Sequence, residues 1–161
     1  MSQAAQIDDA RQHALHARAA KRAEAEAMGI DSVFISEMVE RFYASIRTDE
    51  LLGPIFAERI ADWPVHLARM KQFWRSILHN SGEFSGNPMA RHMAIPGLTE
   101  VHFTRWLDLF YANLRAMEEE PRATRLVAAR ARMIAESLLT GIAIKREGIE
   151  GCRAKRSLPH V

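Results

Sequence analysis

The stretch Asn-Pro-Met-Ala-Arg-His-Met-Ala-Ile-Pro-Gly, residues 87–97, encodes a helix that is too short to be stable by itself. Its first proline suits the opening turn of a helix, because the backbone N–H that proline lacks has no partner there, and its Pro-Gly pair ends the helix. The helix therefore spans about Met89–Met93, whereas isolated helices shorter than about 12–15 residues are marginal in water. Other parts of the protein must hold it, either by packing on Met89 and Met93 or through a bond from His92 to a metal.

On both sides of this segment the sequence predicts longer helices, each with one apolar face at three- and four-residue spacing. The inward positions are Phe34, Met38, Phe42 and Ile46 in the first; His66, Met70, Phe73 and Ile77 in the second; Phe103, Trp106, Phe110 and Leu114 in the third; and Leu126, Met133, Ile134 and Leu138 in the last. A Gly-Pro turn signal predicts a short corner over Thr48–Phe56. No segment shows the sustained alternation of a half-buried strand, so we expect an all-α fold.

Chain length and the placement of the aromatic residues indicate one core. A chain of 161 residues suits a single domain of ordinary size, and all twelve aromatic side chains lie between Phe34 and Tyr111. Residues 1–30 are rich in good helix formers but poor in large apolar side chains, which predicts a loosely packed helical arm. We expect the globular domain over residues 31–146 and a flexible basic tail over residues 147–161.

Charge and cysteine content exclude several classes of protein. The net charge is 0 over residues 1–30, −4 over residues 31–120 and +6 over residues 121–161, and an acidic middle argues against a nucleic-acid groove in the core. The single cysteine, Cys152, cannot form an internal disulfide. No apolar run approaches the roughly 20 residues that cross a membrane, and no secretory signal is visible, so we expect a cytoplasmic protein without membrane or nucleic-acid partners.

Four polar side chains fall on or beside the predicted apolar faces: Tyr43, His66, His92 and Trp106. Each alone is most simply a core residue, but an unpaired buried polar group costs about 1–3 kcal/mol, and Asp and Glu are scarce on these faces. A buried ligand that accepts hydrogen bonds would supply the missing partners. Haem fits, because it needs one strong protein ligand, often a histidine, together with an apolar slot and a distal side whose donors decide the chemistry.

Other cofactor and catalytic sites have less support. A carboxylate-bridged di-iron bundle needs Glu-x-x-His pairs, and the sequence contains none. His13 and His16 form only a pair on the polar arm, short of a zinc site. Neither a Gly-x-Ser-x-Gly nucleophile motif nor a phosphate-binding glycine loop occurs. A cofactor-free helical interaction module therefore stays as the main alternative to a haem protein.

Six short motifs follow one another within residues 31–140. They are Phe42-Tyr43-Ala44-Ser45-Ile46-Arg47, Leu51-Leu52-Gly53-Pro54-Ile55-Phe56, Trp63 followed by His66, Phe73-Trp74, Gly86-Asn87-Pro88 leading to His92, and Phe103-Thr104-Arg105-Trp106-Leu107. In this order they resemble the group III truncated haemoglobins. The resemblance implies a shortened globin fold, a two-over-two helical sandwich around one haem b, with the N-terminal arm as an addition.

The resemblance also implies roles for individual residues. His92 matches the proximal iron ligand, Tyr43 and Trp106 match distal hydrogen-bond donors, His66 matches the distal histidine, and Phe56 matches a phenylalanine that packs on the haem. The expected wall of the haem slot further includes Met70, Phe73, Met89 and Phe103. Only nine residues separate Phe56 from His66, which leaves open whether the His66 ring points over the iron or outward.

The expected function is binding of dioxygen, nitric oxide or carbon monoxide at the histidine-ligated iron. Two distal donors would slow ligand escape, so we expect ligand chemistry or sensing rather than transport, with an unidentified reductase as partner. A peroxidase-like, dioxygenase-like or nitric oxide detoxifying enzyme is the alternative within the haem proteins. The residues do not identify the physiological ligand.

Overall fold

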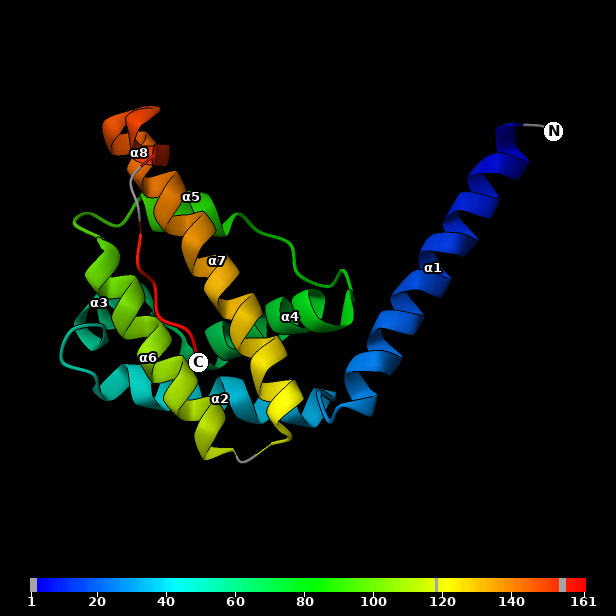
Figure 1. The fold of residues 1–161 in the computed structure, drawn as a ribbon, viewed down its shortest axis with the longest axis horizontal. Helices are drawn as coiled ribbons and strands as arrows, with labels where there is room; N and C mark the ends of the chain where they lie inside the picture. Colours follow the sequence, from blue (N-terminus) through cyan, green and yellow to red (C-terminus); the bar gives the residue numbers. More distant parts are fainter. Residues whose placement is uncertain (1–2, 118, 154–155) are drawn as a thin grey trace.

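A computed structural model describes residues 3–117, 119–153 and 156–161, and every regular element in these ranges is a helix (Figure 1). The helices are α1 (Gln3–Ala27), α2 (Ser32–Thr48), α3 (Gly53–Arg59), α4 (Trp63–His79), α5 (Pro88–Met93), α6 (Glu100–Ala116), α7 (Pro121–Glu147) and α8 (Glu150–Arg153). In this described part of the chain, no helix is both long and apolar enough to span a membrane. The prediction of an all-α fold is confirmed.

Local side chains explain where three of these helices begin. The side chain of Asp31 accepts the N–H of Phe34 at 2.8 Å, that of Asp62 accepts the N–H of Val65 at 3.1 Å, and that of Asn87 accepts the N–H of Ala90 at 3.0 Å. These bonds satisfy backbone donors that have no partner within the helix. The caps of α2, α4 and α5 therefore fix the starting points of the helices that carry Tyr43, His66 and His92.

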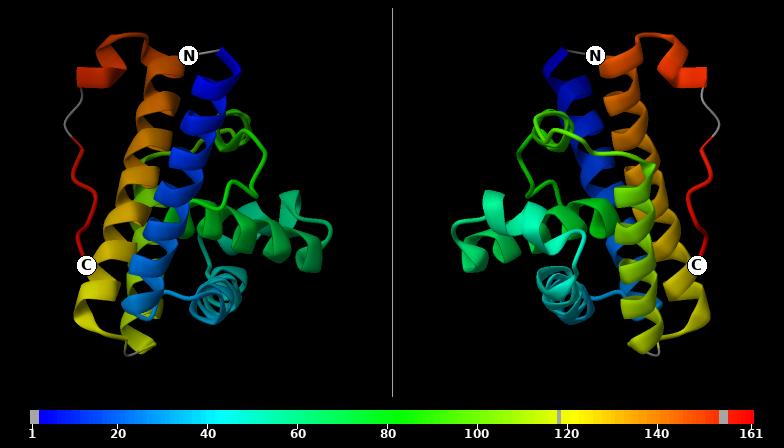
Figure 2. Two further views of the ribbon diagram at one scale, coloured as in Figure 1. Left: turned by 90° about the vertical axis from the view of Figure 1, so that its right-hand side faces the viewer. Right: turned by 90° about the vertical axis from the view of Figure 1, so that its left-hand side faces the viewer.

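Two helix pairs make up the body. α2 packs on α4, α6 packs on α7, and α2 also packs on α6. Figure 2 shows α2 end-on while α6 and α7 run up the page, so α2 crosses α6 and α7. Aromatic rings fill the crossing: Phe110 of α6 stacks on Trp74 at 5.2 Å and on Trp106 at 5.3 Å between ring centroids. Such ring pairs contribute about 0.5–1.5 kcal/mol beyond the area they bury.

The segment predicted to be a short corner contains a helix instead. Residues 53–59 form α3, because Asp49 accepts the backbone N–H groups of Leu51 and Leu52 at 3.2 and 2.9 Å and so orders the chain just before it. Arg105 of α6 holds the Asp49 carboxylate at 2.6 Å. The sequence pattern missed this helix because Arg105 lies 56 residues away along the chain.

One predicted inward residue is wrong. Met133 of α7 is 56% exposed, whereas Ala131 and Ala135 are almost fully buried. Alanines on the inner face let α7 approach α6 closely, and the side chain of Met133 points to solvent instead. The other inward positions of α7 that were predicted, Leu126, Ile134 and Leu138, are half-buried or buried.

The two ends of the chain differ in how they meet the body. α1 extends away from it in Figure 1, and among the described residues of this helix only Ala25 is buried. At the other end Leu158 is 3% exposed, and Pro159 accepts a hydrogen bond from the Tyr111 hydroxyl at 2.8 Å. Leu158 and Pro159 therefore pack against the body, within a segment that the sequence predicted to be a flexible tail; residues 154 and 155 lie outside the described ranges. The division at residues 30 and 146 stays a prediction.

Candidate functional site

A mostly apolar cavity of about 690 Å³ lies among α2, α3, α4, α5, α6 and α7. Its volume falls within the roughly 300–1,000 Å³ of small-molecule and cofactor sites. Eight residues named from the sequence line it together, namely Tyr43, Phe56, His66, Met70, Phe73, His92, Phe103 and Trp106. The fold thus brings one histidine from α4, another from α5, and aromatic side chains from four helices to a single cavity.

Met89 is the one named residue that does not line this cavity. Its sulfur lies against Gly141 in α7, and Met89 is not among the residues of the cavity wall. Met89 was expected in the wall because it stands three residues before His92, where a helix would place both side chains on roughly the same side. The structure uses Met89 to attach α5 to α7 instead.

One ring nitrogen of His92 has no hydrogen-bond partner among the residues that the structure describes. Its Nδ1 donates to the carbonyl oxygen of Pro88 at 2.7 Å, within the same short helix. Because a carbonyl can only accept, the Nδ1 carries the hydrogen and the Nε2 keeps its lone pair. A backbone bond of this kind fixes both tautomer and ring orientation in histidines that ligate metals. His92 therefore has the chemistry of an axial ligand.

Tyr43 and Trp106 flank the same phenylalanine. The Phe42 ring meets Tyr43 at 5.1 Å and Trp106 at 5.2 Å, both edge-on. Tyr43 is 6% exposed, and burial raises the pKa of its hydroxyl far above the ordinary value. The hydroxyl therefore keeps its proton at any physiological pH. Both side chains can donate a hydrogen bond to an acceptor in the cavity.

His66 lies inside this wall rather than pointing outward. Its ring packs edge-on against Tyr43 at 5.0 Å and against Trp63 at 5.7 Å. Burial lowers the pKa of His66, and the positive charges of Arg69 and Arg91 lower it further. Its Nε2 is buried and has no hydrogen-bond partner among the described residues. A buried nitrogen without a partner costs about 1–3 kcal/mol, which a ligand in the cavity would offset.

Three arginines and a histidine that the sequence pattern did not predict for the site also lie around this cavity. Arg59, Arg69 and Arg91 line it, and so does His102 of α6. The Nδ1 of His102 accepts the N–H of Thr99 at 3.1 Å, so its Nε2 carries the hydrogen. Two of the arginines could have been noticed, since Arg69 is one turn from His66 and Arg91 adjoins His92. A charged residue on a helix is usually solvated, however, and the pattern gave no reason to place these inward.

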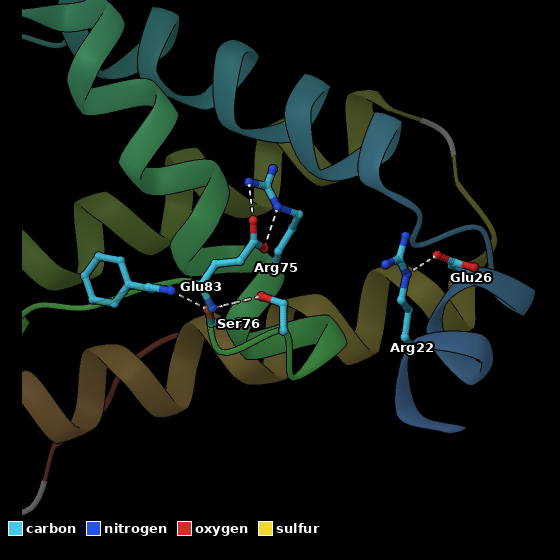
Figure 3. Close-up of polar contacts among 7 residues, drawn as sticks. Arg22, Glu26, Arg75, Ser76 and Glu83 are labelled. Carbon is cyan, nitrogen blue, oxygen red and sulfur yellow. Dashed lines mark hydrogen bonds and ion pairs between the residues drawn. The ribbon is translucent and has the colours of Figure 1, made fainter. Parts of the chain in front are cut away.

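A loop closes one side of the cavity, and Figure 3 shows what holds it. The Arg75 guanidinium donates two hydrogen bonds to the Glu83 carboxylate, of 2.8 and 3.0 Å, and the Ser76 hydroxyl accepts the N–H of Phe84 at 3.0 Å. The Arg75 guanidinium lowers the pKa of Glu83. Phe84 lines the cavity and packs on Phe73 at 5.2 Å. The loop therefore belongs to the cavity wall.

This fold and site define a class, the globins: crossed helix pairs enclose an apolar cavity, and a histidine with a free Nε2 stands on a short helix. Among known proteins, no family model matches the chain. The chain is 33% identical over 110 residues to the group 3 truncated haemoglobin ctb of Campylobacter jejuni, which covers 66% of this chain and 86% of the relative. The crystal structure of the group III truncated haemoglobin from that organism matches with a TM-score of 0.66 and 30% identity, over 70% of this chain and 91% of that one.

The chain belongs to the group III truncated haemoglobins. The two-over-two helical sandwich expected from the resemblance is confirmed, and α1 is an addition to it. Membership of this family implies a haem cofactor. The cavity suits one, since it offers an imidazole nitrogen for the metal, apolar walls for the ring and cations for its carboxylates.

Proposed function

We propose that this protein holds haem b through His92 and binds dioxygen or another diatomic ligand, nitric oxide or carbon monoxide, beside Tyr43 and Trp106. One observation carries the proposal: a single cavity is lined by a histidine whose Nε2 keeps its lone pair, by the buried donor Tyr43 and by the partly buried donor Trp106. The similar proteins are named as truncated haemoglobins, which supports the same function.

Different lining residues would contact the ring and the carboxylates of the cofactor. Phe56, Phe73 and Phe103 provide apolar surface for a porphyrin ring, and Arg69, Arg91 and His102 provide donors for its carboxylates. Haem iron, when bound, supplies the metal on which a diatomic ligand is taken up. The protein supplies the axial imidazole, the dry surroundings and the hydrogen bonds.

The two donors favour retention of the ligand over rapid exchange. A ligand that gains negative charge on binding accepts hydrogen bonds worth about 1.5–3 kcal/mol each. Since each 1.4 kcal/mol is a factor of ten, two such bonds would slow release by at least about a hundredfold. Slow release suits chemistry on the ligand, or sensing, better than transport.

Replacement of the donors tests this proposal. In Tyr43→Phe the haem-loaded protein loses one donor, and we expect dioxygen to dissociate about tenfold faster or more in a stopped-flow displacement experiment. Trp106→Phe should act in the same direction. Tyr111→Phe is the matched control, because the Tyr111 hydroxyl bonds to Pro159 outside the cavity and its loss should leave the rate unchanged. An unchanged rate in Tyr43→Phe would mean that its hydroxyl does not meet the ligand.

A peroxidase-like activity is the second candidate, favoured by the state of His66. A neutral imidazole with a buried and unpaired Nε2 can accept a proton from a peroxide in the cavity. Turnover would also need a reductant or reductase partner. Peroxide consumption by the loaded protein that drops at least about tenfold in His66→Leu would support this activity, and equal consumption by both proteins would exclude the role of His66.

A further inference from the structure

The helix that carries His92, α5, is too short to be kept in place by contacts within itself. α5 comprises six residues and, in the described structure, none of them is buried. It packs against α7, and its two methionines, Met89 and Met93, both approach α7 at Gly141. The position of the His92 ring therefore depends on how α5 lies against α7.

Gly141 is the point of closest approach. A Cβ atom built at this position would overlap the sulfur of Met89, lie 2.8 Å from its methyl carbon and lie 3.3 Å from the methyl carbon of Met93. Real Cβ atoms essentially never come as close as the first two separations, so the end of the flexible Met89 side chain, or α5 with it, would have to shift. The absent side chain at 141 thus leaves room for the ends of the Met89 and Met93 side chains, which lie one helical turn apart on α5.

The residues after Gly141 hold the same region by hydrogen bonds. The Lys145 ammonium donates to the carbonyl oxygen of Met93 at 3.4 Å, and the Arg146 guanidinium donates to that of Leu98 at 2.6 Å. These cations satisfy carbonyls at and beyond the end of α5 that have no partner within a helix. Residues 141–146 of α7 thus pack against α5 and also donate hydrogen bonds to carbonyls at and beyond its end.

We propose that Gly141 is a positioning residue for the haem site, which sets the distance of α5 from α7 and thereby the place of His92. The inference rests on the proposed function in that His92 is the axial ligand. Movement of α5 carries His92 with it, because the Nδ1 of His92 is tied to Pro88 within the same helix. Gly141 itself does not line the cavity.

The test is a double-mutant cycle of Gly141→Ala and Met89→Ala in the haem-loaded protein. Overpacking by one methyl group should push α5 away, so we expect Gly141→Ala to release haem to a scavenging apoglobin about tenfold faster and to shift the iron–histidine stretching frequency in the Raman spectrum. In the Met89→Ala background the added methyl has room, and the same substitution should change neither quantity. An equal effect of Gly141→Ala in both backgrounds would overturn the proposal.

A second readout does not need haem. In haem-free protein, Gly141→Ala should increase the hydrogen exchange of residues 88–97 and leave that of α2 unchanged. If Gly141 were an ordinary mid-helix glycine, its replacement by alanine would stabilise α7, and hydrogen exchange at residues 88–97 would not increase. Unchanged or slower exchange at residues 88–97 overturns the proposal. Failure of the unmutated protein to bind haem would rule out the proposed function, whereas the exchange measurement would still test the packing of α5 against α7 at Gly141.

Discussion

Burial acts in opposite directions on the pKa values of two residues in the cavity. It raises the pKa of the Tyr43 hydroxyl and lowers the pKa of the His66 imidazole, because in each case the charged form is the one that loses water. Both side chains are therefore neutral at pH 7. Tyr43 remains a donor, and His66 keeps one nitrogen that can accept.

His66 should make stability depend on pH. Because its pKa in the folded protein lies below the ordinary value of about 6.5, the unfolded chain binds more protons than the folded one below that pH. The free energy of unfolding is therefore highest above pH 6.5 and falls as the pH drops toward the folded pKa. Tyr43 and Trp63 pack against the ring, and the positive charges of Arg69 and Arg91 lie near it.

Urea unfolding of the haem-free protein between pH 7.5 and pH 5 measures this dependence. We expect the free energy of unfolding to decline more steeply in the unmutated protein than in His66→Leu, which has no proton to bind. His13→Leu, on the exposed part of α1, is the control and should keep the original slope. Identical slopes for all three proteins would show that His66 is not held neutral by burial.

Among the elements, the loop between α4 and α5 is the part of the cavity wall that depends most on charge. Arg75 and Glu83 hold it through an ion pair whose side chains are 25% and 40% exposed, so salt screens it partly. Such pairs are worth about 0–1 kcal/mol. The pair is accordingly expected to affect retention of a cofactor behind Phe84 more than overall folding.

Removal of this ion pair should speed haem loss. For Arg75→Ala we expect transfer of haem to a scavenging apoglobin to become about two- to fivefold faster, with a smaller difference at high salt. The charge-swapped protein Arg75→Glu with Glu83→Arg should recover most of the original rate. Arg41→Ala breaks the pair with Glu37 on α2, away from the cavity, and serves as control. Equal haem transfer in Arg75→Ala and Arg41→Ala would contradict a role for the loop.

Helical spacing of apolar residues was enough to predict α2, α4, α6 and α7, since each buries one continuous face. It failed where an element depends on distant partners. The chain just before α3 is ordered by Asp49, whose carboxylate is held by Arg105, and this distant partner does not show as a local pattern. The inner face of α7 consists largely of alanines, so the large residue Met133 misled the prediction.

The candidate site was predictable to the extent that its residues are unusual for a core. Tyr43, His66, His92 and Trp106 stand out because polar groups rarely lie on apolar faces. The arginines and His102 do not stand out, because surface helices contain many such residues. Gly141 could not be recognised either, since its importance follows only from the approach of α5, which lies about 50 residues earlier in the chain.

For the molecule as a whole, the arm is separate from the cavity. The residues of α1 up to Ala20 are all exposed where the structure describes them, and none of them lines the cavity. We infer that the arm is an accessory to a complete globin body.

Truncation tests this independence. Deletion of residues 1–16 leaves Arg18 in place beside Gly82 of the loop, and over residues 3–16 it removes only exposed side chains. We expect haem affinity and ligand dissociation rates to stay the same and the free energy of unfolding to change by no more than about 0.5 kcal/mol. A large loss of bound haem on deletion would mean that the arm is part of the site.

The most direct test of the account is an absorption titration of the purified protein with haem. We expect a Soret band that saturates at one haem per chain. In His92→Gly the spectrum should lose the features of a histidine-ligated iron. Added imidazole, which fills the place of the missing side chain, should restore them. His66→Gly should keep the original proximal signal. A titration without a Soret band, or a spectrum unaltered in His92→Gly, would contradict the assignment of this cavity as a haem site ligated by His92.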